Sequence, residues 1–152
     1  GPEDLNQAAV GLAETVREFY KRTCNIDLQF TVAARTMPRW AQGPEYGHTV
    51  LLEHRYRHGG APFLVLLRSD EARLSSGRYL GEAFGGVGGF CVVAGDQPYV
   101  HATVRHELAH LLLGDEHEEG TFMQAEIEVE NRIVTKEQRT KIRETAHQFG
   151  SL

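Results

Sequence analysis

This sequence of 152 residues has no run of about 18 apolar residues, the length that a membrane-spanning helix needs, so no membrane span is expected. Its only cysteines are Cys24 and Cys91, too few for a disulfide framework, and we expect two buried free thiols, with a single bridge between them as the alternative. Basic residues are also in deficit, with 16 Lys and Arg against 21 Asp and Glu and a net charge of -5. Because nucleic-acid-binding proteins usually present a basic face, nucleic acid is not an expected partner.

The N-terminus lacks a basic segment followed by an apolar one, so the sequence shows no signal peptide. Gly1-Pro2 is typical of the remnant that stays behind when a purification tag is cleaved, so both a secreted and a cytoplasmic location stay open. The length corresponds to one domain, and we expect residues 3–152 to form a single unit and a monomer.

Four patterns organise the first half of the chain. Apolar residues recur at steps of three and four from Leu5 to Tyr20, which predicts an amphipathic helix. Residues 26–32 alternate between apolar and polar, which is typical of a half-buried strand. The apolar run over 62–67 is too short for a typical helix and predicts a central strand covered on both faces. A weaker strand pattern covers residues 48–56.

Glycines flank a short apolar run in the stretch GEAFGGVGGFCVVAGD, which begins at residue 81. Glycine lets the backbone come close to another backbone or to a ligand, and a short strand in this setting is expected at the edge of a sheet. A glycine-rich hairpin with no further role is equally compatible with the pattern.

Helix signals return in the last third of the chain. Residues 100–113 have a helical pattern, and Gly114 lies where a left-handed cap would end the helix. Residues 115–134 have no periodicity. Thr135-Lys-Glu-Gln138 is a capping-box signature, which predicts a final helix with Ile142, Ala146 and Phe149 on one face.

The predicted helix over 100–113 contains the sequence His106-Glu107-Leu-Ala-His110. At 3.6 residues per turn, His106 and His110 are about 40° apart on one helix face, so their imidazoles can bind one ion. Neutral imidazole suits Zn²⁺, and catalytic zinc takes three protein ligands and leaves the fourth position to water. Glu107 comes off the same helix beside the first ligand and is the expected general base for the zinc-activated water.

A third ligand must come from outside this motif. Gly114 can turn the chain sharply and return the next residues toward the metal, which favours a ligand close downstream over a remote one. The candidates are Glu116, His117, Glu118, Glu119, Glu126, Glu128 and Glu130.

The stretch from 106 to 123 resembles the metzincin clan of zinc endopeptidases, whose pattern is H-E-x-x-H-x-x-G-x-x-H followed by a methionine-containing turn. This chain reads HELAHLLLGDEH and then GTFM, so one extra residue precedes the glycine. The site residues that the resemblance implies are Zn²⁺ ligands at His106, His110 and His117, a general base at Glu107, and Met123 as the apolar floor beneath the metal.

The resemblance also implies an α+β fold, with an N-terminal helix packed on a twisted mixed sheet, an active-site helix and a C-terminal helix. Residues 3–152 would then form one zinc metalloprotease catalytic domain that hydrolyses peptide or protein substrates. In that clan a bound substrate runs antiparallel to an edge strand and is held by main-chain hydrogen bonds. The corresponding strand here covers Gly89 to Ala94, and its expected substrate-binding residues are Gly89, Phe90, Cys91 and Val92.

Three alternatives stay open from the sequence. Without a gap in the register, Glu116 replaces the last histidine, and carboxylate is also a zinc ligand. The segment Glu126-Ile-Glu128-Val-Glu130-Asn131 resembles the downstream motif of zincins whose third ligand is a glutamate, including regulatory proteases that cleave repressors. The third alternative is a zinc-binding interaction module that does not cleave anything.

Overall fold

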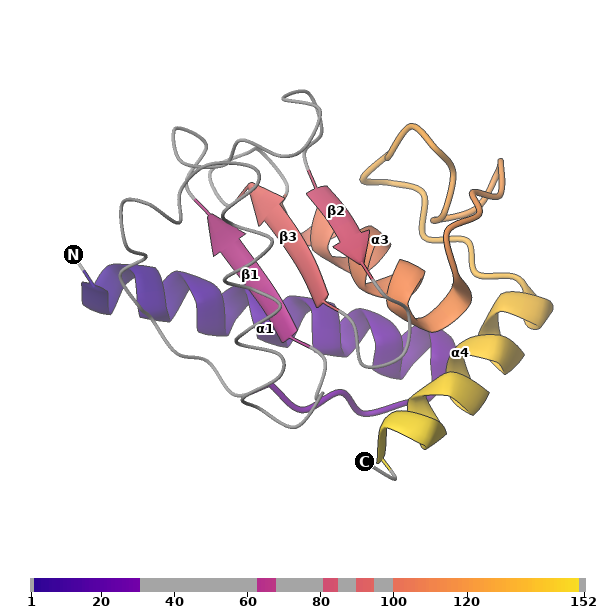
Figure 1. Ribbon diagram of the computed structural model, residues 1–152, viewed down its shortest axis with the longest axis horizontal. Coiled ribbons are helices and arrows are strands. Elements are labelled where there is room, and N and C mark those ends of the chain that lie inside the picture. The colour runs from indigo at the N-terminus through magenta and orange to yellow at the C-terminus, as the bar shows by residue number, and fades with distance from the viewer. Residues whose placement is uncertain (1, 31–62, 68–80, 85–89, 95–99, 151–152) are drawn as a thin grey trace.

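The computed structural model describes residues 2–30, 63–67, 81–84, 90–94 and 100–150 (Figure 1). The elements of these ranges, in chain order, are α1 (Pro2–Cys24), β1 (Phe63–Leu67), β2 (Gly81–Phe84), β3 (Phe90–Ala94), α3 (Val100–Leu113) and α4 (Lys136–Gly150). The strand that the sequence predicts over 48–56 lies outside the described residues.

Helix α1 confirms the amphipathic pattern. Val16, Phe19 and Tyr20 are buried, and most of the residues between and before them are exposed. The helix ends at Cys24, and the next residue, Asn25, has a φ of 55°, a left-handed conformation that asparagine tolerates. None of the described helices is long and apolar enough to cross a membrane.

Residues 26–30 do not form the predicted strand, although their side chains alternate as expected. The residues that pack against the core are Ile26, Leu28 and Phe30, and the two residues between them are exposed. Alternation with a period of two shows which side chains are buried, and it does not require that the backbone pairs with a neighbouring strand. The prediction is therefore wrong for this segment, and residues 31 and 32 lie outside the described ranges.

The three described strands form a mixed sheet in the order β1-β3-β2. Strand β1 is parallel to β3, with Phe63 opposite Phe90, and β2 is antiparallel to β3, with Gly81 opposite Val93. The glycine-rich stretch thus contributes an antiparallel strand pair, and β3 rather than β1 is central among the described strands.

The expectation that β3 lies at the edge of the sheet is wrong for the described strands. Phe90, Cys91 and Val92 have hydrogen-bonded neighbours on both sides, so their backbone has no open side to which a peptide could add. Gly89 lies outside the described residues. In the described sheet, the parallel strand β1 and the antiparallel strand β2 each pair only with β3, so both have no further described partner on their other side.

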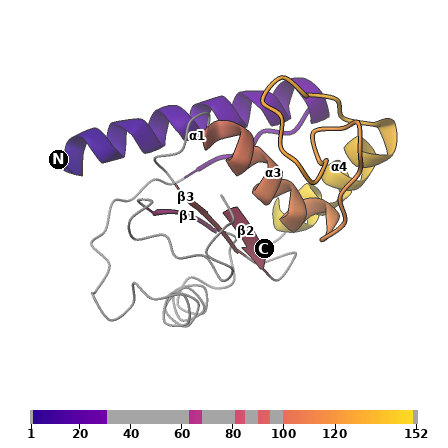
Figure 2. The ribbon, with the colours of Figure 1, turned by 90° about the horizontal axis from the view of Figure 1, so that it is seen from above.

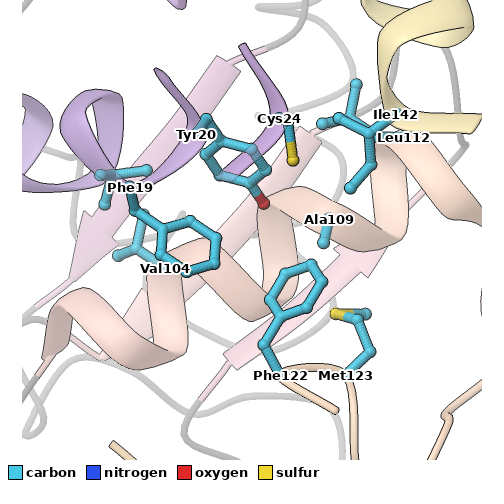
Figure 3. Packing of buried hydrophobic residues seen from close by; sticks show 10 residues of the cluster. Phe19, Tyr20, Cys24, Val104, Ala109, Leu112, Phe122, Met123 and Ile142 are labelled. Atoms are coloured by element: carbon cyan, nitrogen blue, oxygen red, sulfur yellow. The ribbon is translucent and has the colours of Figure 1, made fainter. Parts of the chain in front are cut away.

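Helix α3 is the element around which the others pack. It contacts β2, β3, α1 and α4, and Figure 2 shows α1 and α3 on the same face of the sheet. Figure 3 shows the hydrophobic core between the helices, to which α1, α3, α4 and the segment around Phe122 and Met123 all contribute. Because α3 is covered from several directions, ten of its fourteen residues are buried, polar ones included.

The predicted C-terminal end of α3 and the predicted start of α4 are confirmed. Gly114, with a φ of +103°, follows α3, and its N–H donates to the carbonyl of His110 at 2.9 Å. At α4, the Thr135 N–H donates to Gln138 Oε1 at 2.9 Å, and the Gln138 N–H donates to Thr135 Oγ1 at 3.1 Å. These reciprocal bonds are a capping box, which satisfies two amide groups that no helical carbonyl can reach. On α4, Ile142 is buried.

Helix α1 supports α3 through Tyr20, a fully buried residue whose hydroxyl donates to the Arg105 carbonyl at 2.5 Å. We expect Tyr20→Phe to lower the free energy of unfolding by about 1 kcal/mol, the usual net contribution of such a bond. Thermal unfolding of a chain of this size should then shift down by about 2–4 °C. An unchanged melting temperature would show that this bond contributes nothing to stability.

Candidate metal centre

Three imidazoles come together at the C-terminal end of α3. His106 and His110 project from successive turns of the helix, and His117 joins them from the segment after it. Each residue offers one ring nitrogen, and these three nitrogens lie within 4.8 Å of one another. The ring centroid of His117 is 5.3 Å from that of His106 and 5.0 Å from that of His110. The structure therefore contains a three-histidine cluster that could hold a metal ion.

Gly114 allows the chain to turn back after the helix. Its positive φ of +103° is a conformation that residues with a Cβ rarely adopt. His117 follows three residues later and reaches the cluster despite the extra residue before the glycine. The other candidate ligands do not join it: among the described residues, the grouped ligands do not include Glu116, Glu128 or Glu130.

Hydrogen bonds fix which ring nitrogens carry the protons. His106 Nδ1 lies 3.3 Å from the Phe122 carbonyl oxygen, and His110 Nδ1 lies 2.8 Å from that of Gly114. Since a carbonyl oxygen only accepts hydrogen bonds, each Nδ1 is the N–H donor. In the neutral rings, both Nε2 atoms therefore carry lone pairs. Such backbone partners are the usual outer support of metal-binding histidines.

The two Nε2 atoms of His106 and His110 lie 3.2 Å apart. Two lone pairs at this distance repel each other, and a cation between them turns the repulsion into two favourable contacts. Nitrogens that each lie about 2.0–2.1 Å from one tetrahedral Zn²⁺ are about 3.3 Å apart. The spacing and the donor type therefore fit a tetrahedral zinc ion.

Burial keeps the helical imidazoles neutral. It lowers the pKa of His106 to about 4, and the neighbouring ring of His110 adds to this effect. Burial also lowers the pKa of His110, while its bond to the Gly114 carbonyl acts in the opposite direction. His117, in contrast, is exposed, so the cluster has one side toward solvent. Neutral imidazoles near pH 7 are the form that binds a metal, because the competing proton is already absent.

Glu107 lies between two of the cluster's histidines in sequence, and Met123 follows the third. Glu107 follows the first histidine on α3 and is only 7% exposed. Met123 is 1% exposed and belongs to the hydrophobic core, next to the residue whose carbonyl contacts His106. The segment that contains Met123 thus contacts the cluster through the backbone carbonyl of Phe122. The spacing of the motif alone did not predict this contact.

Arg105, directly before the first histidine, is a residue that the sequence reasoning missed. It is buried, and its Nη2 donates to the carbonyls of Val129 and Asn131 at 2.8 and 3.2 Å. Its guanidinium carbon lies 4.9 Å from the ring centroid of Phe19, a cation–π contact. The arginine thereby connects α3 with α1 and with the segment after Met123. The only sequence signal was a charged residue on a largely apolar helix.

The lowered pKa of His106 predicts how stability depends on pH in the metal-free protein. Below about pH 6.5 the unfolded chain binds a proton at this residue that the folded protein takes up only near pH 4. The free energy of unfolding should therefore be highest above pH 6.5 and fall as the pH drops toward 4, by about 3 kcal/mol for this residue.

Urea unfolding of chelator-treated protein between pH 5 and 7 measures this dependence. The variant His106→Gln, which cannot titrate in that range, should show a flatter profile than the wild type. Equal profiles for the two proteins would contradict the assignment of the pH dependence to His106.

Comparison with protein-family models, with curated proteins and with solved structures finds no match for this chain. The interpretation of the three-histidine cluster therefore depends on its own geometry.

Proposed function

We propose that this chain is a zinc-dependent endopeptidase of metzincin type, with His106, His110 and His117 as the metal ligands. The observation that carries the proposal is the pair of Nε2 atoms 3.2 Å apart, each on a ring whose Nδ1 faces a backbone carbonyl. The third imidazole keeps the glycine-to-histidine spacing of the metzincin pattern, three residues after a glycine with positive φ, although both lie one residue later than in that pattern.

A donor set of three imidazoles supports a catalytic role over a structural one. Structural zinc sites close all four positions with protein ligands, whereas catalytic sites keep one position for water or substrate. Among the described residues, the group holds three ligands, of which His117 is exposed. This composition argues against a purely structural zinc module, and the absence of Glu128 and Glu130 from the group argues against the zincins with a glutamate ligand.

Glu107 supplies the general base in this proposal. A bound zinc would acidify a water molecule and polarise the scissile carbonyl of the substrate. Glu107, next to His106 on the buried helix, would accept the proton of the water and pass it to the leaving amine. Its burial supports this role, since a carboxylate that is shielded from bulk water exchanges protons with the reacting groups and not with the solvent.

We place the substrate backbone along β2 instead of β3. Strand addition needs a strand at the edge of the sheet, and among the described strands β1 and β2 each pair only with β3. Contact with the active-site helix favours β2. Helix α3, which carries the histidines, contacts β2, so a peptide along Gly81–Phe84 would run near the metal.

Metal analysis and peptide cleavage by the wild-type protein test the proposal. We expect one Zn²⁺ per chain and hydrolysis of members of a diverse peptide library. A chelator should abolish the hydrolysis, and added Zn²⁺ should restore it. A folded protein that bound no zinc, or that carried zinc and cleaved none of the peptides, would overturn the endopeptidase assignment.

A further inference from the structure

The segment between His117 and Met123 is a closed turn. The Glu118 N–H donates to the Met123 carbonyl at 2.9 Å, and the Thr121 N–H donates to the Glu118 carbonyl at 3.3 Å. Gly120, with a φ of +80°, provides the left-handed conformation within the turn. Both ends of this turn reach the metal centre, because His117 precedes it and the Phe122 carbonyl contacts His106.

Thr121 holds the turn together from the inside. This side chain is buried, and its hydroxyl donates to the Glu118 carbonyl at 2.8 Å. The same oxygen accepts hydrogen bonds from the Met123 N–H at 3.1 Å and from Gln138 Nε2 at 3.0 Å. A hydroxyl has one hydrogen to donate and two lone pairs, so all of its bonding capacity is used.

Gln138 connects the turn to α4. Its side chain is buried, and Nε2 donates both to Thr121 Oγ1 and to Glu118 Oε2, the latter at 2.8 Å. Its Oε1 accepts from the Thr135 N–H as part of the capping box. The amide therefore has one orientation that satisfies every partner, with the oxygen toward the helix start and the nitrogen toward the turn.

We propose that Thr121 and Gln138 are positioning residues of the metal centre. They hold the 118–123 turn against α4, so that His117 and the Phe122 carbonyl are placed where the helical histidines require them. This inference rests on the proposed zinc site, and it assigns the site a support outside the H-E-x-x-H helix. Outer partners of metal ligands typically change metal affinity by about 10- to 100-fold when they are removed.

The identity of residue 138 separates this role from helix capping. A glutamate at this position serves a capping box as well as a glutamine does. It cannot donate to Glu118, however, and its carboxylate would repel that side chain. Gln138→Glu therefore keeps the cap and removes the attachment of the turn, whereas Thr135→Ala removes the side-chain half of the cap and keeps the attachment.

The test measures Zn²⁺ affinity by competition with a chromophoric chelator. Gln138→Glu should bind zinc about 10- to 100-fold more weakly than the wild type. Thr135→Ala should lower the melting temperature and leave the zinc affinity unchanged. The double variant Glu118→Gln/Gln138→Glu exchanges donor and acceptor, and it should recover most of the lost affinity.

Thr121→Val and Thr121→Ser provide a second pair, because serine keeps the hydroxyl and valine keeps the shape. Weaker zinc binding by the valine variant alone would support the inference even if Gln138→Glu failed to fold. A folded Gln138→Glu protein with wild-type affinity would overturn the positioning role and leave the zinc site intact. A wild-type protein that bound no zinc would overturn the proposed function itself.

Discussion

Glu107→Gln is expected to lower kcat/KM for peptide hydrolysis by about 10²- to 10⁴-fold, the range that a general base contributes. The amide keeps the size and polarity of the buried side chain but cannot accept the proton of a water molecule. Zinc content should stay at the wild-type value, since Glu107 is not among the grouped ligands. Steady-state kinetics on a peptide that the wild type cleaves, together with metal analysis, measure both quantities.

Glu137→Gln is the matched control for this experiment, because Glu137 is an exposed glutamate at the start of α4. It should leave both the kinetics and the zinc content unchanged. Wild-type turnover by Glu107→Gln would remove this residue from the mechanism. A simultaneous loss of zinc would instead make the carboxylate part of the metal site.

His117→Ala is expected to weaken Zn²⁺ binding by more than about 100-fold. Removing a hydrogen-bond partner of a ligand weakens metal binding by up to about 100-fold, and this substitution removes a ligand itself. Because His117 is exposed, the metal-free variant should melt at nearly the same temperature as the metal-free wild type, as is usual for a surface substitution. Chelator competition and thermal unfolding of the metal-free proteins provide the two measurements.

Glu116→Ala, Glu128→Ala and Glu130→Ala are the controls for the choice of ligand. None of these residues joins the histidine group, and all three are exposed. We therefore expect each variant to bind zinc like the wild type. Loss of zinc in Glu128→Ala or Glu130→Ala, with retention in His117→Ala, would replace the metzincin assignment by a zincin with a glutamate ligand.

Local sequence signals predicted the elements that carry the ligands. The boundaries of α3, the left-handed Gly114 and the capping box before α4 each depend on residues within a few positions of one another, so spacing was sufficient. The position of His117 was also predictable, because a glycine turn determines where the next residues go. The described part of the fold agrees with a mixed sheet and three helices.

Features that depend on distant contacts were missed or wrong. The central position of β3 follows from which strands pair, and the apolar run over 90–94 has no preference for the edge or the middle of a sheet. Gln138 lies twenty residues from Glu118, and Arg105 lies more than twenty from the carbonyls it binds. Such partners are set by how helices and turns pack in three dimensions, which periodicity does not encode.

The three imidazoles come from only twelve consecutive residues, His106 to His117. Closing so short a loop around an ion costs little conformational entropy, and the cost grows only slowly with loop length. The denatured chain can therefore chelate zinc with the same side chains that bind it in the folded protein. An ion that binds both states raises the free energy of unfolding by less than its affinity for the native protein alone implies.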